Sequence, residues 1–160
     1  MMAGRGTADI PGVIAPPPLI YLGFLALGWG GGQLIDEPSL GLDRPVQAGI
    51  AIAGLVLGLA VEAWAAGLFH KARTAVQPWK PSTALVTGGV YGFTRNPIYV
   101  GFAVTYLALA VGLDSPLAIV LLIPCLLVVD RFVIQREEVY LAARFGADYE
   151  AYRRRVRRWL

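Results

Sequence analysis

The residues best suited to chemistry lie in a polar, glycine-rich stretch at positions 85–101. Gly88, Gly89 and Gly92 allow sharp turns or a close approach to a ligand. Pro97 suits the first turn of a helix, so we expect a loop that carries Arg95, Asn96 and two tyrosines to a helix start. The free N–H groups and positive dipole of that helix end suit an anionic group such as a carboxylate. The alternative is a plain loop that enters a helix.

The composition of the chain predicts an integral membrane protein. Hydrophobic residues make up 56% of the 160 positions, charged residues 16%, and the mean hydropathy is +0.58. Soluble domains carry nearer a quarter of charged residues. The single cysteine, Cys125, lies in an apolar run, so neither a disulfide framework nor a zinc site is expected and we assign it to the core.

We expect one all-α, polytopic membrane domain over residues 1–160, with a flexible N-terminus at 1–15. Apolar runs predict four membrane helices, at residues 18–35, 45–69, 98–113 and 117–134. The third is short for a span, which needs about 20 residues. The turn residues Asp114-Ser115-Pro116 join the last two runs, which we therefore expect to form an antiparallel helical hairpin.

Residues 135–160 predict a basic amphipathic tail outside the membrane. Apolar side chains recur there at three- and four-residue spacing, and Gly146 is expected to break the helix in two. The tail and the loop between the second and third runs hold most of the basic residues. The positive-inside rule therefore places both, and both termini, in the cytoplasm. The arginines can also bind anionic lipid, which is compatible with a site.

Two features of the second run have alternative explanations. Gly54 and Gly58 form a GxxxG pair, which predicts either a packing face for another helix or a homodimer. Glu62 is costly within a membrane and is therefore a functional candidate. Its alternative is partial burial near the interface, paired to a base or to Trp64 and backbone water. His70, the only histidine, is interpreted as an interface residue rather than a base.

Two motifs carry a family resemblance. The first reads Leu85-Val86-Thr87-x-Gly89-Val90-Tyr91-x-x-x-Arg95-x-Pro97-x-Tyr99-Val100-Gly101, and the second runs from Arg136-Glu137-Glu138 to Arg158-Trp159. Together they resemble the signature of the isoprenylcysteine carboxyl methyltransferase family, which is related to the phospholipid N-methyltransferases. The resemblance covers residues 82–160, about half of the chain.

The resemblance implies S-adenosylmethionine as methyl donor and a membrane-embedded helical fold that encloses it on the cytosolic side. Carried over by position, the cofactor contacts fall on Thr83, Ala84, Leu85, Val86, Tyr91, Asn96, Pro97, Ile98, Tyr99 and Glu137. These residue types suit the donor. Aromatic faces stabilise a sulfonium cation, a carboxylate suits its amino group, and free N–H groups suit its carboxylate.

The candidate catalytic residues are Arg95, Asn96 and Glu138. Asn96 replaces the histidine usual in the family, so it can position a partner but does not titrate near neutral pH. Val133 replaces an arginine that is associated with the substrate in the eukaryotic enzymes. An amine or thiol acceptor must lose a proton, to Glu138, Tyr99 or water, whereas a carboxylate needs no base.

The expected function is methyl transfer from S-adenosylmethionine to a lipophilic or membrane-associated acceptor that enters from the bilayer. Carboxylate, amine, thiol and phenol acceptors stay open. A lipid or lipophilic substrate and membrane lipids are the expected partners, with no nucleic acid and no metal. The alternatives are an NADPH-dependent membrane reductase and a non-catalytic scaffold with a degenerate site.

Overall fold

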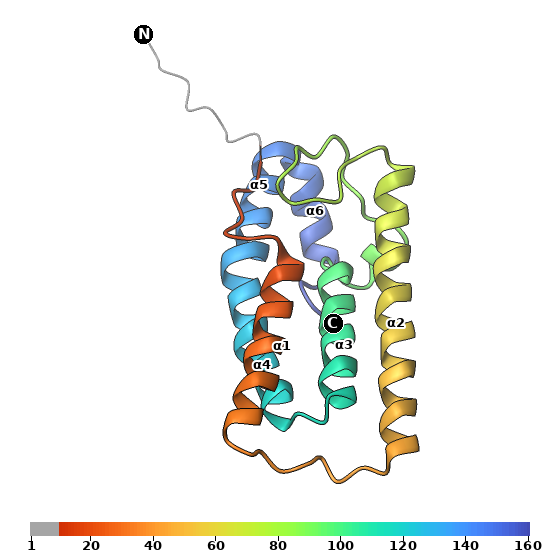
Figure 1. Cartoon of the computed structure of the whole chain (residues 1–160). Coiled ribbons are helices and arrows are strands. Elements are labelled where there is room, and N and C mark those ends of the chain that lie inside the picture. The colour runs from red at the N-terminus through yellow and green to blue at the C-terminus, as the bar shows by residue number, and fades with distance from the viewer. Residues whose placement is uncertain (1–9) are drawn as a thin grey trace.

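The computed structural model describes residues 10–160, and over that range the chain is helical with no strand. Residues 1–9 of the segment expected to be flexible lie outside the described residues. Four long helices alternate in direction along the chain (Figure 1). They are α1 (Pro17–Leu34), α2 (Arg44–Lys71), α3 (Pro97–Gly112) and α4 (Pro116–Val129). Each has a proline at its first or second position, where the missing N–H costs no helical hydrogen bond.

The helix expected at 117–134 does not stop at the apolar boundary. After α4 the chain continues through a π-helical turn, η2 (Asp130–Ile134), directly into α5 (Gln135–Phe145). The expected break is confirmed at Gly146, whose φ of +50° lies in the region that favours glycine. The last helix is α6 (Ala147–Arg155). The expected turn at 114–116 is also confirmed, and it makes α3 and α4 neighbours.

One end of the four helices is capped by polar elements. The loop from 72 to 96, which contains the 3₁₀ turn η1 (Gly89–Gly92), lies there together with α5 and α6 (Figure 1). The other end carries only the α1–α2 connection and the short α3–α4 turn. The stretch that the sequence singles out therefore lies at the end built from the C-terminal tail.

The glycine pair in α2 packs against another helix of the same chain. A Cβ on Gly54 would come within 2.8 Å of the Ala108 Cβ, and one on Gly58 within 2.9 Å of the Gly101 carbonyl oxygen. The pair is thus confirmed as a packing face, and α3 occupies it. A homodimer through Gly54 and Gly58 stays a prediction, and it requires a face that α3 covers here.

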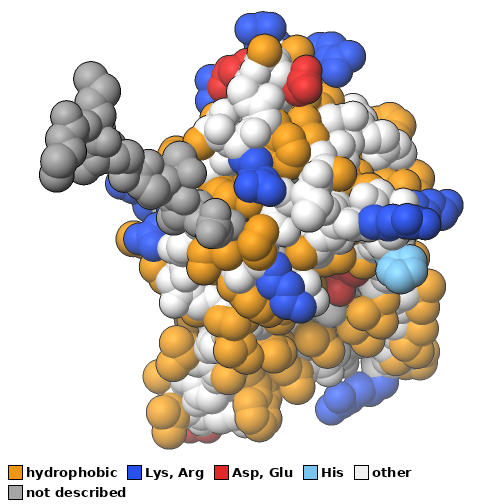
Figure 2. Space-filling model, turned by 90° about the horizontal axis from the view of Figure 1, so that it is seen from above, with side chains coloured by type: hydrophobic (Ala, Val, Ile, Leu, Met, Phe, Trp, Pro, Cys, Tyr) orange, Lys and Arg blue, Asp and Glu red, His pale blue; other side chains and the backbone are white. Residues whose placement is uncertain are grey.

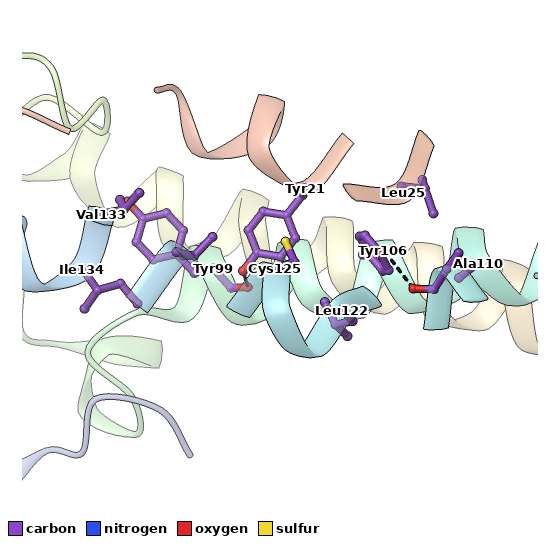
Figure 3. Close-up of a cluster of buried hydrophobic side chains, with 11 residues drawn as sticks. Tyr21, Leu25, Tyr99, Tyr106, Ala110, Leu122, Cys125, Val133 and Ile134 are labelled. Atoms are coloured by element: carbon purple, nitrogen blue, oxygen red, sulfur yellow. Dashed lines mark hydrogen bonds between the residues drawn. The ribbon is translucent and has the colours of Figure 1, made fainter. Parts of the chain in front are cut away.

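Tyrosine hydroxyls tie neighbouring helices together inside the core (Figure 3). Tyr21 on α1 donates to the Tyr99 carbonyl on α3 at 3.0 Å, and Tyr106 donates to the Ala118 carbonyl on α4 at 2.7 Å. Cys125 is fully buried among these residues, as expected. Each hydroxyl finds an acceptor, so these polar groups add specificity to the helix packing at little desolvation cost.

Within residues 10–160, two helices are long and apolar enough to cross a membrane: α2 and the continuous helix Pro116–Phe145. The apolar part of the second ends at Ile134, because the polar residues of α5 follow. Only 11% of the most apolar window of α2 is buried in the protein, so its apolar side chains face outward as lipid-facing residues would. Helix α3 is apolar but shorter, and the count of four spans stays a prediction.

Replacing Gly58 by alanine tests the α2–α3 contact. The new methyl group meets the Gly101 backbone, which cannot move without shifting α3, so we expect a loss of roughly 1–3 kcal/mol of stability. Gly67→Ala is the matched control, because nothing lies within 4 Å of its Cβ position. It should be neutral or gain up to about 1 kcal/mol from helix propensity. Thermal unfolding in detergent measures both, and equal melting temperatures would contradict this packing.

Candidate functional site

A pocket lies at the polar end, enclosed by the 72–96 loop, the start of α3, α5 and α6. It contains about 810 Å³ of empty space, including its open mouth. Its walls are formed by Pro11, Phe69, Ala75, Val76, Gln77, Pro78, Ser82, Ala84, Leu85, Val86, Tyr91, Arg95, Asn96, Ile98, Tyr99, Glu137, Glu138, Tyr140, Leu141, Tyr149 and Tyr152.

This pocket brings together ten of the twelve residues that the sequence nominates. They come from the loop, from the start of α3 and from the start of α5. The two exceptions are Thr83 and Pro97. Thr83 faces the loop, where its N–H donates to the Thr74 hydroxyl at 2.9 Å and its hydroxyl donates to the Arg73 carbonyl at 3.0 Å. Pro97 is fully buried in the first turn of α3.

Glu137 is the pocket carboxylate without a counter-ion. Its Oε1 accepts a hydrogen bond from the Tyr99 hydroxyl at 2.7 Å, and no Lys, Arg or His side chain of residues 10–160 lies within 4.0 Å of it. Burial raises the pKa of Glu137 to about 7, an effect that the Tyr99 bond reduces and the nearby Glu138 increases. A cation in the pocket would favour its charged form.

Glu138, the next residue, is held in ion pairs on both sides. The Arg95 guanidinium lies 3.1 Å from its Oε1, and Arg158 binds both oxygens, at 2.9 and 2.7 Å. The side chains of Glu138 and Arg95 are 11% and 10% exposed, so solvent screens the Arg95–Glu138 pair little. The Glu138 hydrogen bonds raise the pKa of Arg158, which stays charged. Glu138 is thus a structural anion that joins loop and tail.

The C-terminal segment after α6 binds the backbone just before α3. The Arg157 carbonyl accepts from the Arg95 N–H at 2.9 Å. The Arg158 carbonyl accepts from the Thr94 hydroxyl at 3.1 Å and from the Asn96 side-chain amide at 2.9 Å. Asn96 therefore uses its NH₂ group to fasten the C-terminal segment, which leaves its side-chain oxygen for the pocket.

Tyrosine side chains form the inner wall. Tyr152 on α6 donates to the Tyr91 carbonyl at 2.8 Å, and the Tyr91 ring packs on the Phe69 ring with centroids 5.4 Å apart. Burial raises the pKa of both Tyr91 and Tyr152 above the ordinary phenol value. Their phenols therefore stay neutral and contribute aromatic faces rather than charges.

Helix α5 fixes the loop on the other side of the pocket. The Tyr140 hydroxyl accepts from the Ser82 N–H at 2.9 Å, and the Arg144 guanidinium donates to the Ser82 carbonyl. These bonds hold the segment that precedes the pocket residues 84–86. The start of α3 adds backbone donors, because the N–H groups of Ile98 and Tyr99 donate to no acceptor among residues 10–160.

The pocket residues that sequence reasoning did not nominate include two groups. One is the wall at 75–78, an irregular segment without a pattern that would have marked it. The other is the pair of tyrosines on α6, Tyr149 and Tyr152. They were recognised as part of the apolar stripe of the tail, but that periodicity could not say which site the stripe faces.

Comparison with known proteins identifies sequences that are similar to this chain. A family model described as phospholipid methyltransferase matches residues 46–148. An uncharacterized protein of Haemophilus influenzae is 40% identical over 63 residues, which cover 39% of this chain and 100% of that protein. The protein-S-isoprenylcysteine O-methyltransferase of Schizosaccharomyces pombe is 40% identical over 75 residues, or 45% of this chain and 30% of that enzyme. No solved structure matches the chain.

Replacing Arg158 by alanine tests the connection between tail and loop. The change removes the partner of Glu138 and of Asp130, and we expect a loss of about 1–2 kcal/mol, because these pairs are partly exposed. Arg154→Ala is the control, since Arg154 is exposed and makes no ion pair with residues 10–160. Thermal unfolding in detergent compares the two, and an unchanged melting temperature for the Arg158 variant would show that the ion pairs do not hold the tail.

Proposed function

The chain belongs to the phospholipid methyltransferase family, and from that premise we propose that it transfers a methyl group from S-adenosylmethionine to a lipophilic acceptor. The observation that carries the proposal is Glu137, a carboxylate without a counter-ion in a pocket that also offers aromatic faces and free N–H groups. The matched part of the S. pombe enzyme is 30% of its length, so its substrate is not transferred to this chain.

The pocket residues fit the methyl donor group by group. S-adenosylmethionine, when bound, supplies an electrophilic methyl group on a sulfonium. Glu137 would hold the donor's amino group, and the N–H groups of Ile98 and Tyr99 would hold its carboxylate. The Tyr91 ring would face the sulfonium, because neutral aromatic faces attract cations. The apolar walls at Leu85 and Val86 would take the remaining, flatter part of the molecule.

The chain contributes alignment and exclusion of water rather than covalent chemistry. Methyl transfer is a displacement that depends on holding the two reactants in line, and a pocket anchored from three directions can do this. We assign Arg95, Asn96 and Glu138 to this positioning, because each is bonded to the C-terminal segment or to its arginines. For an amine or thiol acceptor we assign the proton to water, since two arginines already engage Glu138.

We further propose four spans with both termini on the cytoplasmic side. Basic side chains support this orientation, since several Lys and Arg side chains but few acidic ones surround the pocket end (Figure 2). The opposite connections carry a single base, Arg44. Exposed apolar side chains on α1, α2 and α4 would then face lipid. A donor would enter from the cytosol, and an acceptor sideways from the bilayer.

Calorimetric titration with S-adenosylhomocysteine tests donor binding directly. We expect micromolar affinity for the wild type and at least about a tenfold loss for Glu137→Gln, which removes a charge-assisted hydrogen bond. Tyr91→Ala should also lose affinity. Glu150→Gln is the control, because Glu150 forms an exposed ion pair on α6. Wild-type affinity in the Glu137 and Tyr91 variants would contradict the assignment of these residues to the donor site. If the wild type bound NADPH but not S-adenosylhomocysteine, the result would favour a reductase.

The pH dependence of that binding follows from the raised pKa of Glu137, about 7. Only the carboxylate attracts the ammonium group of the ligand, so affinity should be highest above pH 7. It should fall as the pH drops through about 7, by up to about tenfold per pH unit below the pKa. The same titration at several pH values between about 6 and about 8 measures this slope. The Glu137→Gln variant should show a flat profile, and a flat wild-type profile would exclude Glu137 from the contact.

A further inference from the structure

A second hollow opens on the flank of the helices, away from the pocket at the polar end. It contains about 490 Å³ of empty space, including its open side, and lies between α1, α2 and α3. Its lining is almost entirely apolar: Pro18, Tyr21, Leu22, Leu25, Phe102, Tyr106 and Leu109, with Thr105 and Glu62 as its polar members. Part of this lining, at Tyr21, Leu25 and Tyr106, appears in Figure 3.

Glu62 is the ionisable side chain that lines this flank groove. Its Oε1 accepts a hydrogen bond from the Thr105 hydroxyl at 2.9 Å, whereas Oε2 accepts none from residues 10–160. Within the same residues no Lys, Arg or His side chain comes within 4.0 Å of it. One alternative explanation of Glu62 was a salt bridge to a basic residue near the membrane interface. The described part of the chain contains no such salt bridge.

The position of Glu62 is built into the helix packing. A Cβ on Gly101 would come within 2.6 Å of the Glu62 Cγ, so the glycine on α3 makes room for this carboxylate. Glu62 lies nine residues before the end of α2, about 13 Å along the helix axis. It thus lies on the apolar flank rather than among the polar groups of the end cap.

Glu62 lies against apolar side chains without the basic partner that usually accompanies a carboxylate in an apolar environment. Placing a charge against apolar walls is costly unless it is paired, and one hydroxyl does not neutralise it. From this charge and these walls we infer that the flank groove binds a lipophilic amine, an alkyl chain that ends in an ammonium group. The alkyl chain lies along the leucines, and the ammonium donates to Oε2 of Glu62.

This site goes beyond the proposed function, since it concerns binding alone and holds whichever molecule is methylated. It is separated from the pocket at the polar end by an aromatic layer. Tyr21 lines the groove and donates to the carbonyl of Tyr99, which lines the other pocket. A ligand in the groove therefore lies next to the pocket wall without occupying the pocket.

The test measures binding of radiolabelled dodecylamine and dodecanol to the purified protein in lipid nanodiscs, with protein-free nanodiscs as the background. We expect saturable amine binding that Glu62→Gln weakens at least about tenfold, the magnitude of a lost ion-paired hydrogen bond. Dodecanol binding should be weaker and unchanged in that variant. Equal amine affinity in wild type and Glu62→Gln would overturn the inference, as would equal wild-type affinity for dodecanol and dodecylamine.

Two further variants keep the result interpretable. Leu22→Trp fills the rim of the groove from an exposed position on α1 and should weaken binding of both ligands. Unchanged binding of both ligands in this variant would contradict the placement of the site. Glu150→Gln should change neither. S-adenosylhomocysteine affinity, measured on the same samples, should be unaffected by Glu62→Gln. If the wild type did not bind S-adenosylhomocysteine, the proposed function would be refuted, but the amine-binding result would still test the flank groove.

Discussion

The ion pairs of Glu138 connect three parts of the chain that are distant in sequence. Glu138 opens α5, Arg95 precedes α3, and Arg158 lies almost at the C-terminus. Because the Glu138 and Arg95 side chains are nearly buried, loss of Glu138 would leave the Arg95 charge without an ion-pair partner among residues 10–160. The carbonyls of the C-terminal segment then satisfy the backbone and side chains at 94–96. The pocket exists because these contacts bring loop and tail to the same helix end.

The π-helical turn between α4 and α5 belongs to the same arrangement. Asp130, its first residue, binds the Arg158 guanidinium at 3.2 Å and the Trp159 indole N–H at 3.1 Å. Val133 and Ile134 in the same turn are fully buried in the helix core. One extra residue per turn rotates the helix, so the turn can present an apolar face inward and an acid to the tail. The site and the helix core are therefore coupled at this point.

Glu137 and Glu62 are cavity-lining carboxylates that make no ion pair with residues 10–160, and they mark different environments. Glu137 faces an open polar pocket and is bonded by a tyrosine, and Glu62 faces an apolar flank and is bonded by a threonine. Neighbouring Glu138 shows the opposite case, a carboxylate whose charge the chain itself neutralises. A carboxylate that lines a cavity and makes no ion pair is available to a ligand, whereas the charge of Glu138 is already used to hold the fold.

Sequence alone determined the helices, because their apolar runs, opening prolines and the break at Gly146 are local signals. Through two motifs it also nominated twelve site residues, of which ten line the pocket. It could not show that Thr83 turns into the loop, or that Asn96 fastens the C-terminal segment, because each depends on a partner far along the chain. Only the tertiary structure decided that α3 fills the glycine face of α2 and that Glu138, unlike Glu137, is neutralised. Local residue type fixes what a side chain can do, and its long-range neighbours fix whether that capacity is already used.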